Sequence, residues 1–200
     1  MAQDRSVTFF DTQFQTQIAQ QDFALNPFEQ AAWPHLQGRV LDFGCGLGNL
    51  ALRAARAGHA VLALDASATA VAHLNALAAT EGLALQAREA DLRSLRLDER
   101  FDTVLCIGLL MFFERPQALA QLAHLQSLVN PGGVAVLNVL VEGTTYLDMF
   151  DPGAYCLFGP TELRAHFAGW DVLADEQQDF DAPGGQRKVF HTLMARRVAR

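Results

Sequence analysis

The sequence predicts an α/β fold in which helices cover both faces of a mostly parallel sheet. Short apolar runs rich in Val, Leu and Phe recur along the chain, and segments with apolar residues at every third or fourth position separate them. The runs lack strict alternation of apolar and polar residues, which is typical of parallel strands buried on both faces. Turn residues between the last two runs indicate that the sheet ends in an antiparallel hairpin.

The strands predicted in the first two thirds of the chain are short. Their ranges are 39–43, 60–64, 83–87, 101–107 and 134–141. Helical spacing of apolar residues lies between them, at 50–57, 71–77 and 119–129. Pro116 stands just inside the start of the last helix, and the Asn-Pro-Gly-Gly segment 130–133 ends it. Ahead of the first strand, the Asn-Pro-Phe segment 26–28 predicts the cap of another helix.

The pattern changes after residue 141. A segment rich in turn residues and aromatics leads to a short helix around 161–167, followed by strands near 170–177 and 187–196. The Asp-Ala-Pro-Gly-Gly segment 181–185 between those strands predicts a hairpin at one edge of the sheet. Because no repeat or linker divides the chain, we expect a single domain over residues 1–200.

Composition excludes several classes of protein. With 15 Lys and Arg against 22 Asp and Glu, the formal charge of −7 disfavours a nucleic-acid partner. The start does not read as a signal peptide, and no run of about 18 apolar residues occurs, so we expect a cytoplasmic protein without a membrane partner. Cys45, Cys106 and Cys156 are expected to be reduced, and no Cys or His spacing indicates a metal site.

A glycine-rich turn carries the strongest chemical signal. Gly44, Gly46 and Gly48 follow a predicted strand and precede a predicted helix, where missing side chains and unpaired N–H groups admit a ligand. Asp65 ends the second strand, and a carboxylate there suits the two hydroxyls of a ribose. Asp91 ends the third strand, where it can face the amino group of adenine. The spacing therefore favours an adenosine cofactor.

A dinucleotide site is the main alternative for such a turn. That pattern needs a small residue five positions after the first glycine, and Asn49 stands there. Asp42, just before the turn, would repel a pyrophosphate but could pair with the cationic amino group of S-adenosylmethionine (SAM). SAM is therefore the predicted cofactor and S-adenosylhomocysteine its product, while a nicotinamide oxidoreductase remains a less favoured alternative.

The ordered motifs VLDFGCGLG, VLALD, EADL, FDTVLCIGLLMFF and NPGG resemble those of the class I SAM-dependent methyltransferases over residues 39–141. This resemblance implies a three-layer, Rossmann-like fold with a seven-stranded sheet. It also implies that 1–38 form a helical cap over the site, 39–141 the cofactor-binding core, and 142–200 the substrate-side segment and hairpin. The cofactor-binding residues it implies are Asp42, Gly44, Cys45, Gly46, Gly48, Asp65, Ala66, Asp91, Leu92, Cys106 and Ile107.

A narrower likeness connects LLMFFERP, FGPTELRAHFAGWDVL and FHTLMARR with the TehB-like tellurite-resistance methyltransferases. Members of that family commonly carry a histidine and arginines in the final hairpin, thought to act on the substrate. Here the stretch reads QQDFDAPGGQRKVF, so Arg187 is the candidate catalytic residue and His191 lies too far along. This departure puts tellurite in doubt as the substrate.

Aromatic and apolar residues near strand ends predict a lidded pocket for the methyl acceptor. The candidates are Phe10, Phe14, Met111, Phe112, Tyr146 and Tyr155, with Phe9, Phe150 and Phe158 as further members. Methyltransferases that act on nucleic acids usually carry Asn/Asp-Pro-Pro-Tyr/Phe after the fourth strand, whereas residues 106–109 here read Cys-Ile-Gly-Leu. This difference disfavours DNA or RNA as the methyl acceptor.

We therefore expect methyl transfer to a small molecule, with a thiol or a chalcogen oxyanion of the tellurite or selenium type as the acceptor, in a monomer or homodimer. A non-catalytic SAM-binding sensor or scaffold is the alternative.

Overall fold

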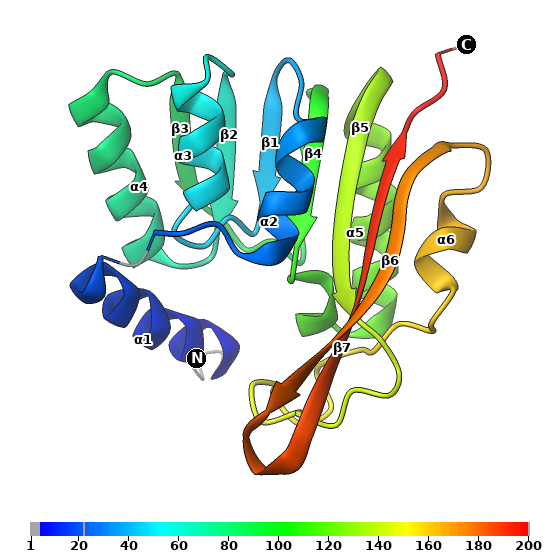
Figure 1. The fold of residues 1–200 in the computed structure, drawn as a ribbon. Coiled ribbons are helices and arrows are strands. Elements are labelled where there is room, and N and C mark those ends of the chain that lie inside the picture. Colours follow the sequence, from blue (N-terminus) through cyan, green and yellow to red (C-terminus); the bar gives the residue numbers. More distant parts are fainter. Residues whose placement is uncertain (1–4, 22, 200) are drawn as a thin grey trace.

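The computed structural model describes residues 5–21 and 23–199. Its centre is a seven-stranded sheet of order β3-β2-β1-β4-β5-β7-β6 (Figure 1). The first five strands are parallel, and β7 runs antiparallel to both β5 and β6. The predicted fold class, a Rossmann-like sheet finished by an antiparallel hairpin, is confirmed.

The strands are β1 Val40–Phe43, β2 Val61–Asp65, β3 Leu85–Glu89, β4 Phe101–Ile107, β5 Val129–Leu140, β6 Asp171–Ala182 and β7 Gln186–Arg196. The α-helices are α1 Arg5–Gln20, α2 Pro27–Ala32, α3 Asn49–Arg56, α4 Ala68–Glu81, α5 Arg115–Leu128 and α6 Glu162–His166. Three short 3-10 helices are η1 Trp33–His35, η2 Leu110–Phe112 and η3 Pro183–Gly185. As predicted, Asn26 caps α2: its side chain accepts from the backbone N–H of Phe28 and of Glu29.

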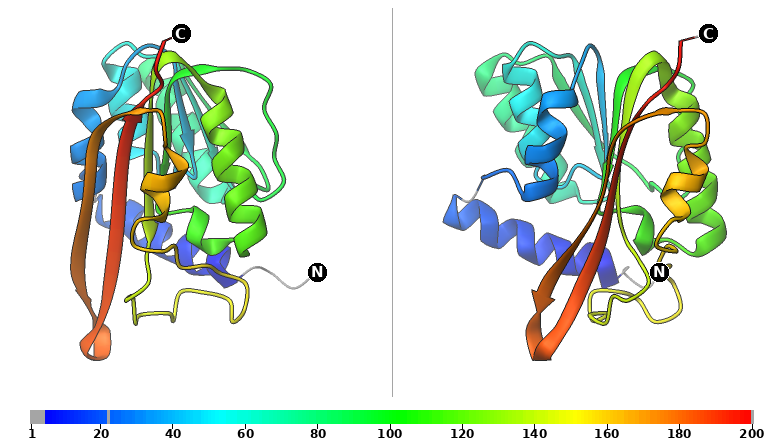
Figure 2. Two further views of the ribbon diagram at one scale, coloured as in Figure 1. Left: turned by 90° about the vertical axis from the view of Figure 1, so that its right-hand side faces the viewer. Right: turned by 45° about the vertical axis from the view of Figure 1, so that its right-hand side comes forward.

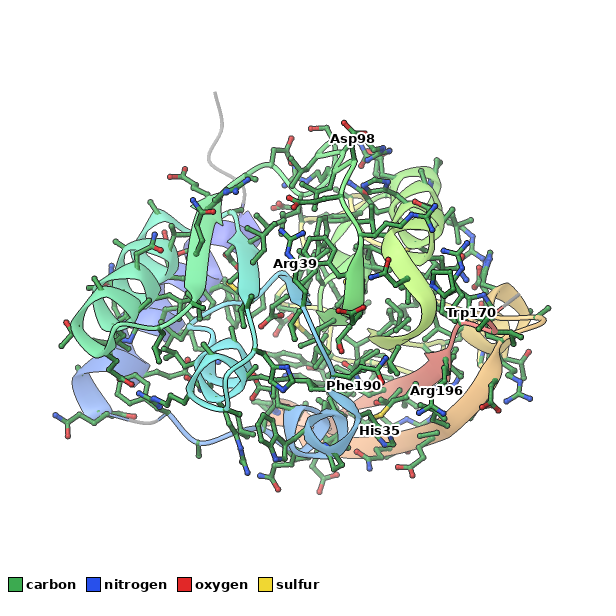
Figure 3. All side chains as sticks on the ribbon, turned by 90° about the horizontal axis from the view of Figure 1, so that it is seen from above. His35, Arg39, Asp98, Trp170, Phe190 and Arg196 are labelled. Atoms are coloured by element: carbon green, nitrogen blue, oxygen red, sulfur yellow. The ribbon has the colours of Figure 1, made fainter. Side chains whose placement is uncertain are left out.

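Helices form a layer on each side of the sheet (Figure 3). One hydrophobic core lies between the sheet and α5 with α6, and contains Leu41 and Cys106. The other lies between the sheet and α2, α3 and α4, and contains Val40 and Leu105. Successive side chains of a strand point to opposite faces of the sheet, so neighbouring residues such as Leu105 and Cys106 pack in different layers.

Two strands are longer than predicted. β5 begins at Val129 rather than at residue 134, because Val129 pairs with Phe101 of β4 and Asn130 Nδ2 donates to Asp102 Oδ1 at 2.8 Å. The Asn-Pro-Gly-Gly segment thus ends α5, as predicted, yet runs beside β4. β6 continues to Ala182 rather than to residue 177, because the hairpin extends beyond the other strands as a two-stranded ribbon (Figure 1).

α1 and this hairpin frame one edge of the sheet. α1 crosses below the carboxyl ends of the parallel strands, and the hairpin projects past the same ends (Figure 2). In open α/β sheets, ligands bind at this edge. Across the described ranges, no helix is long and apolar enough to cross a membrane, and no cluster of three His, Cys, Asp or Glu residues has the arrangement of a metal site.

Candidate functional site

A cavity of about 460 Å³ lies at the carboxyl ends of the strands. Its walls come from α1, α2, the glycine loop, the turns after β2 and β3, the segment after β4, and β7. The predicted cofactor-binding residues that line it are Asp42, Gly44, Cys45, Gly46, Gly48, Asp65, Ala66, Asp91, Leu92 and Ile107. The structure therefore brings these together from four separate segments of the sequence.

Cys106 is the member of the predicted set that does not line the cavity. Its side chain is fully buried in the core on the α5 side of the sheet, where burial raises the pKa of the thiol. The next residue, Ile107, points to the opposite face and reaches the cavity.

The glycine loop is fixed to β2 by its backbone. The N–H groups of Gly44 and Cys45 both donate to the Leu64 carbonyl oxygen, at 2.8 and 3.0 Å. Gly48 has φ +70° and opens α3, and a Cβ placed on it would lie 2.5 Å from Leu74 Cδ2. This position therefore requires glycine for packing as well as for its left-handed conformation.

Asp65 joins the end of β2 to the loop. Its carboxylate accepts from the N–H of Gly46 at 2.8 Å and from the N–H of Ser67 at 2.9 Å. Burial raises the pKa of Asp65, and these backbone donors act against that rise. The side chain is thus held at the cavity wall by the same segments that a ligand would contact.

Asp65 belongs to an acidic group with Asp42 and Glu29. Asp42 is 5% exposed, and burial, with the nearby carboxylates of Glu29 and Asp65, raises its pKa to about 8. Burial also raises the pKa of Glu29, whose Oε2 accepts from the N–H of Asn26 at 2.8 Å. Three carboxylates in one buried wall favour a cationic ligand, which would relieve their mutual repulsion.

Sequence reasoning missed Glu29. The signal that could have found it is local: Glu29 stands three residues after the cap Asn26, and the structure shows the two as a capping box at the cavity wall.

Asp91 and Leu92 form the wall on the β3 side. Asp91 lies two residues beyond the end of β3, and its Oδ1 accepts from the N–H of Arg93 at 3.1 Å. The carbonyl oxygen of Leu92 accepts from the buried amide of Gln121 at 2.6 Å. The turn after β3 is therefore fixed from inside the protein, with Leu92 buried and Asp91 exposed at the cavity.

α1 covers the cavity with aromatic side chains. The ring of Phe14 lies over the glycine loop, 3.1 Å from the position a Cβ of Gly46 would take. Phe10 meets Phe112 edge to face, with 5.2 Å between ring centroids. The Ser67 hydroxyl donates to the Asp11 carboxylate, which anchors the helix to the start of α4.

A third hydrophobic cluster forms the wall near η2 and β7. Met111 and Phe112 belong to this cluster and line the cavity. Phe10 and Phe14 of α1 also line the cavity. The predicted pocket residues Tyr146 and Tyr155 belong to the same cluster but lie behind the lining. Of the further aromatic candidates, Phe9 lines the cavity, Phe150 lies in the cluster and Phe158 is fully buried in the α5-side core.

Arg187, the predicted catalytic residue, lies outside the cavity lining. Its Nε donates to the Gly143 carbonyl oxygen at 3.0 Å, and its guanidinium lies 3.7 Å from Asp179. The next residue, Lys188, points to the other face and lines the cavity, with its Nζ 4.7 Å above the ring centre of Tyr146. Burial lowers the pKa of Lys188.

Sequence reasoning also missed Asn138 near the end of β5. The side chain is fully buried and lines the cavity beside Ile107, its neighbour on β4. Its Nδ2 donates to the Thr192 hydroxyl at 2.8 Å, while its Oδ1 has no hydrogen-bond partner within the described residues. His191 lies on the other face, where its Nε2 is 2.6 Å from Asp175.

Comparisons with known proteins agree with this geometry. Residues 40–133 match the family profile described as a methyltransferase domain. A protein named Hemagglutinin 1 from Eikenella corrodens is 32% identical over 143 residues, covering 70% of this chain and 46% of that protein. The probable S-adenosyl-L-methionine-dependent methyltransferase TehB of Haemophilus influenzae (strain 10810) is 26% identical over 166 residues, which cover 80% of this chain and 57% of that protein. The chain thus spans about half the length of these curated relatives.

Solved structures show the same likeness. The crystal structure of TehB from Haemophilus influenzae superposes with a TM-score of 0.75 at 21% identity, covering 87% of this chain and 63% of that one. A second structure, described as the conversion of a disulfide bond into a thioacetal group during echinomycin biosynthesis, superposes with a TM-score of 0.67 at 28% identity. The match covers 88% of this chain and 82% of that one. The chain therefore has the fold of the class I SAM-dependent methyltransferases and, among them, resembles TehB.

Proposed function

We propose that this protein binds SAM in the cavity and transfers its methyl group to a small-molecule acceptor. The observation that carries the proposal is the acidic group of buried Asp42 and half-buried Glu29 and Asp65 beside a glycine loop. SAM brings two cationic centres, an ammonium and a sulfonium, and few other adenosine cofactors do. A pyrophosphate would meet these carboxylates with repulsion.

The lining residues fit the parts of the cofactor. Asp42 and Glu29 would hold the ammonium, and the close approach allowed by Gly44 and Gly46 would admit the methionine chain. Asp65 would accept hydrogen bonds from the ribose, and Asp91 with Leu92 would border the adenine. Two neighbouring structures, both of magnesium protoporphyrin IX methyltransferase from Synechocystis, hold S-adenosylhomocysteine or SAM, which supports this choice of cofactor.

SAM supplies an electrophilic methyl group, so the protein has to align the acceptor and exclude water. The aromatic side chains of α1 and the cluster around Phe112 would do this by closing an apolar surface over the reacting groups. No histidine is present among the residues described as lining the cavity. An acceptor that ionises easily needs little help from a general base.

A thiol or a chalcogen oxyanion is therefore the acceptor class that we favour. The resemblance to TehB supports the oxyanion, and the relative studied for a reaction at a disulfide supports a sulfur acceptor. Whether the acceptor is tellurite rests on the hairpin, where Arg187 points away from the cavity.

Transfer of a labelled methyl group tests the proposal. The protein is incubated with SAM carrying a labelled methyl and with alkyl thiols, selenite, tellurite, amines and phenols in turn. We expect label in a thiol or chalcogen product, and none with Asp65→Ala. Binding of SAM without transfer to any of these acceptors would instead favour a sensor or scaffold.

A further inference from the structure

Charged side chains divide the cavity into two parts. Glu29, Asp42 and Asp65 gather at the glycine loop, and Asp91 and Arg93, of opposite charge, lie at the turn after β3. On the β7 side the charge is positive and comes from Lys188. A cationic cofactor in the first part would leave the second part for a group of opposite charge.

Lys188 reaches the cavity because side chains alternate between the two faces of β7. On β7, Lys188, Phe190 and Thr192 share one face, and Thr192 bonds Asn138, which also lines the cavity. Phe190 packs against Phe28 of α2, with 4.7 Å between ring centroids. The lysine thus extends along a wall of aromatic side chains on the part of the hairpin that projects past β5.

The ammonium of Lys188 has no acidic partner among the described residues. Over residues 5–21 and 23–199, no carboxylate forms an ion pair with it, although Asp and Glu outnumber Lys and Arg in this chain. It faces the Tyr146 ring instead, at 4.7 Å, and is half-buried. A half-buried cation that lines a cavity and forms no ion pair with a described residue is suited to an anionic ligand.

We propose that Lys188 binds an anionic group of the methyl acceptor, and that the acceptor is an organic anion with an apolar body. This inference rests on the proposed function and narrows its two acceptor classes to the organic thiol, because a bare oxyanion has no apolar body. The same cavity is lined by Phe10, Met111, Phe112 and Met149, which offer contact to an apolar body and no charge.

Asn138 indicates the length of this acceptor. Thr192, its partner, lies four residues from Lys188, so at strand rise the two Cα positions are about 13 Å apart. The unpaired Oδ1 of Asn138 can accept a hydrogen bond from a second polar group of the acceptor. A bare inorganic oxyanion would reach either Asn138 or Lys188, whereas a substituted ring or short chain can approach both.

A matched pair of ligands tests the charge directly. The protein saturated with S-adenosylhomocysteine is titrated calorimetrically with 3-(mercaptomethyl)benzoate and with 3-(mercaptomethyl)benzamide, which differ in one charged group. We expect the benzoate to bind about tenfold more tightly. The preference should disappear in Lys188→Met, which keeps the length and loses the charge, and should persist in Lys188→Arg.

Two arginines of the same strand supply controls. Arg196→Met makes the same charge change at the exposed far end of β7 and should keep the full preference. Arg187→Met tests the neighbouring cation on the opposite face, and should also keep it. Loss of the preference in Arg187→Met but not in Lys188→Met would overturn the inference.

The remaining outcomes separate the inference from the proposed function. Failure of wild-type protein to bind S-adenosylhomocysteine would contradict the proposed function and remove the basis of the inference. Tight cofactor binding with equal affinity for the two ligands, or with no binding of either, would overturn the inference alone. Cofactor binding by each variant shows that its fold is intact.

Discussion

Asp65 Oδ2 accepts a hydrogen bond from the backbone N–H of Gly46, with 2.8 Å between the two atoms. The other carboxylate oxygen accepts from the N–H of Ser67, so one side chain joins the glycine loop to the start of α4. The residue that would hold the ribose therefore also sets the conformation of the loop that would hold the methionine part.

Asp65→Asn should separate these roles only in part. The amide can still accept from one N–H but presents an NH₂ group to the other, so we expect S-adenosylhomocysteine affinity to fall at least about tenfold. Calorimetry measures the affinity, and Glu89→Gln is the matched control, because Glu89 pairs with Asp65 in the sheet but is exposed and outside the cavity. Unchanged affinity in Asp65→Asn would contradict the ribose role.

The pKa of Asp42 predicts how stability depends on pH. It rises from 3.8 to about 8 on folding, so between these values the folded ligand-free protein holds one more proton than the unfolded chain. Stability therefore falls as pH increases through this window. Asp42→Asn should reduce that slope and should be more stable than wild type at about pH 9, on the order of 1–3 kcal/mol. Denaturant unfolding at several pH values measures both effects, and a slope equal to that of wild type would count against the buried acid.

Cofactor binding should release a proton from the same residue. At neutral pH Asp42 is mostly protonated, and a cation bound beside it lowers its pKa. Titrations with SAM in two buffers of different ionisation enthalpy should therefore report release of up to about one proton. Asp42→Asn should release markedly less, and proton uptake by the wild-type protein would exclude a cation at this carboxylate.

Two glycines of the loop should respond differently to alanine. Gly48→Ala places a Cβ 2.5 Å from the buried side chain of Leu74 at φ +70°, and should destabilise the fold by about 2 kcal/mol or more. Gly46→Ala has φ +52° and meets the edge of the Phe14 ring at 3.1 Å, which α1 can relieve by moving. We expect a smaller loss of about 1 kcal/mol but a larger loss of cofactor affinity. Thermal unfolding and calorimetry distinguish the two, and equal effects on stability would contradict this division.

Asn138→Leu should affect function more than folding. It removes a buried oxygen that has no partner but also removes the donor that Thr192 accepts from, so stability should change by no more than about 1 kcal/mol. Acceptor turnover should fall about tenfold if a ligand group uses that oxygen. Denaturant unfolding measures the stability, and transfer of a labelled methyl group measures the turnover. Normal turnover would show that the amide only links β5 to β7.

The sequence was sufficient for the succession of strands along the chain and for the glycine loop, because both are encoded locally. Short apolar runs set the strands, and positive φ values at Gly44, Gly46 and Gly48 explain the spacing of the loop. Asp65 and Asp42 follow from their positions at strand ends. Each of these signals is contained in a segment of a few residues, so no tertiary information is needed to read it.

The rest of the site depends on which face each strand residue meets. Cys106 was predicted together with Ile107, but only Ile107 lines the cavity. Arg187 was predicted alone, whereas its neighbour Lys188 lines the cavity. β4 is apolar on both faces, so alternation does not reveal its orientation. Arg187 and Lys188 pair with β6 beyond the end of β5, so their faces follow from the register of the hairpin. Asn138 reads as one polar residue inside an apolar strand, and its unpaired oxygen appears only once β5 and β7 are adjacent.

The most direct test of this account is calorimetric titration of the protein with SAM, S-adenosylhomocysteine and NAD. The acidic wall of Glu29, Asp42 and Asp65 predicts micromolar binding of the first two and none of NAD. Binding of NAD with no response to SAM or S-adenosylhomocysteine would contradict the proposed cofactor and, with it, the proposed methyl transfer.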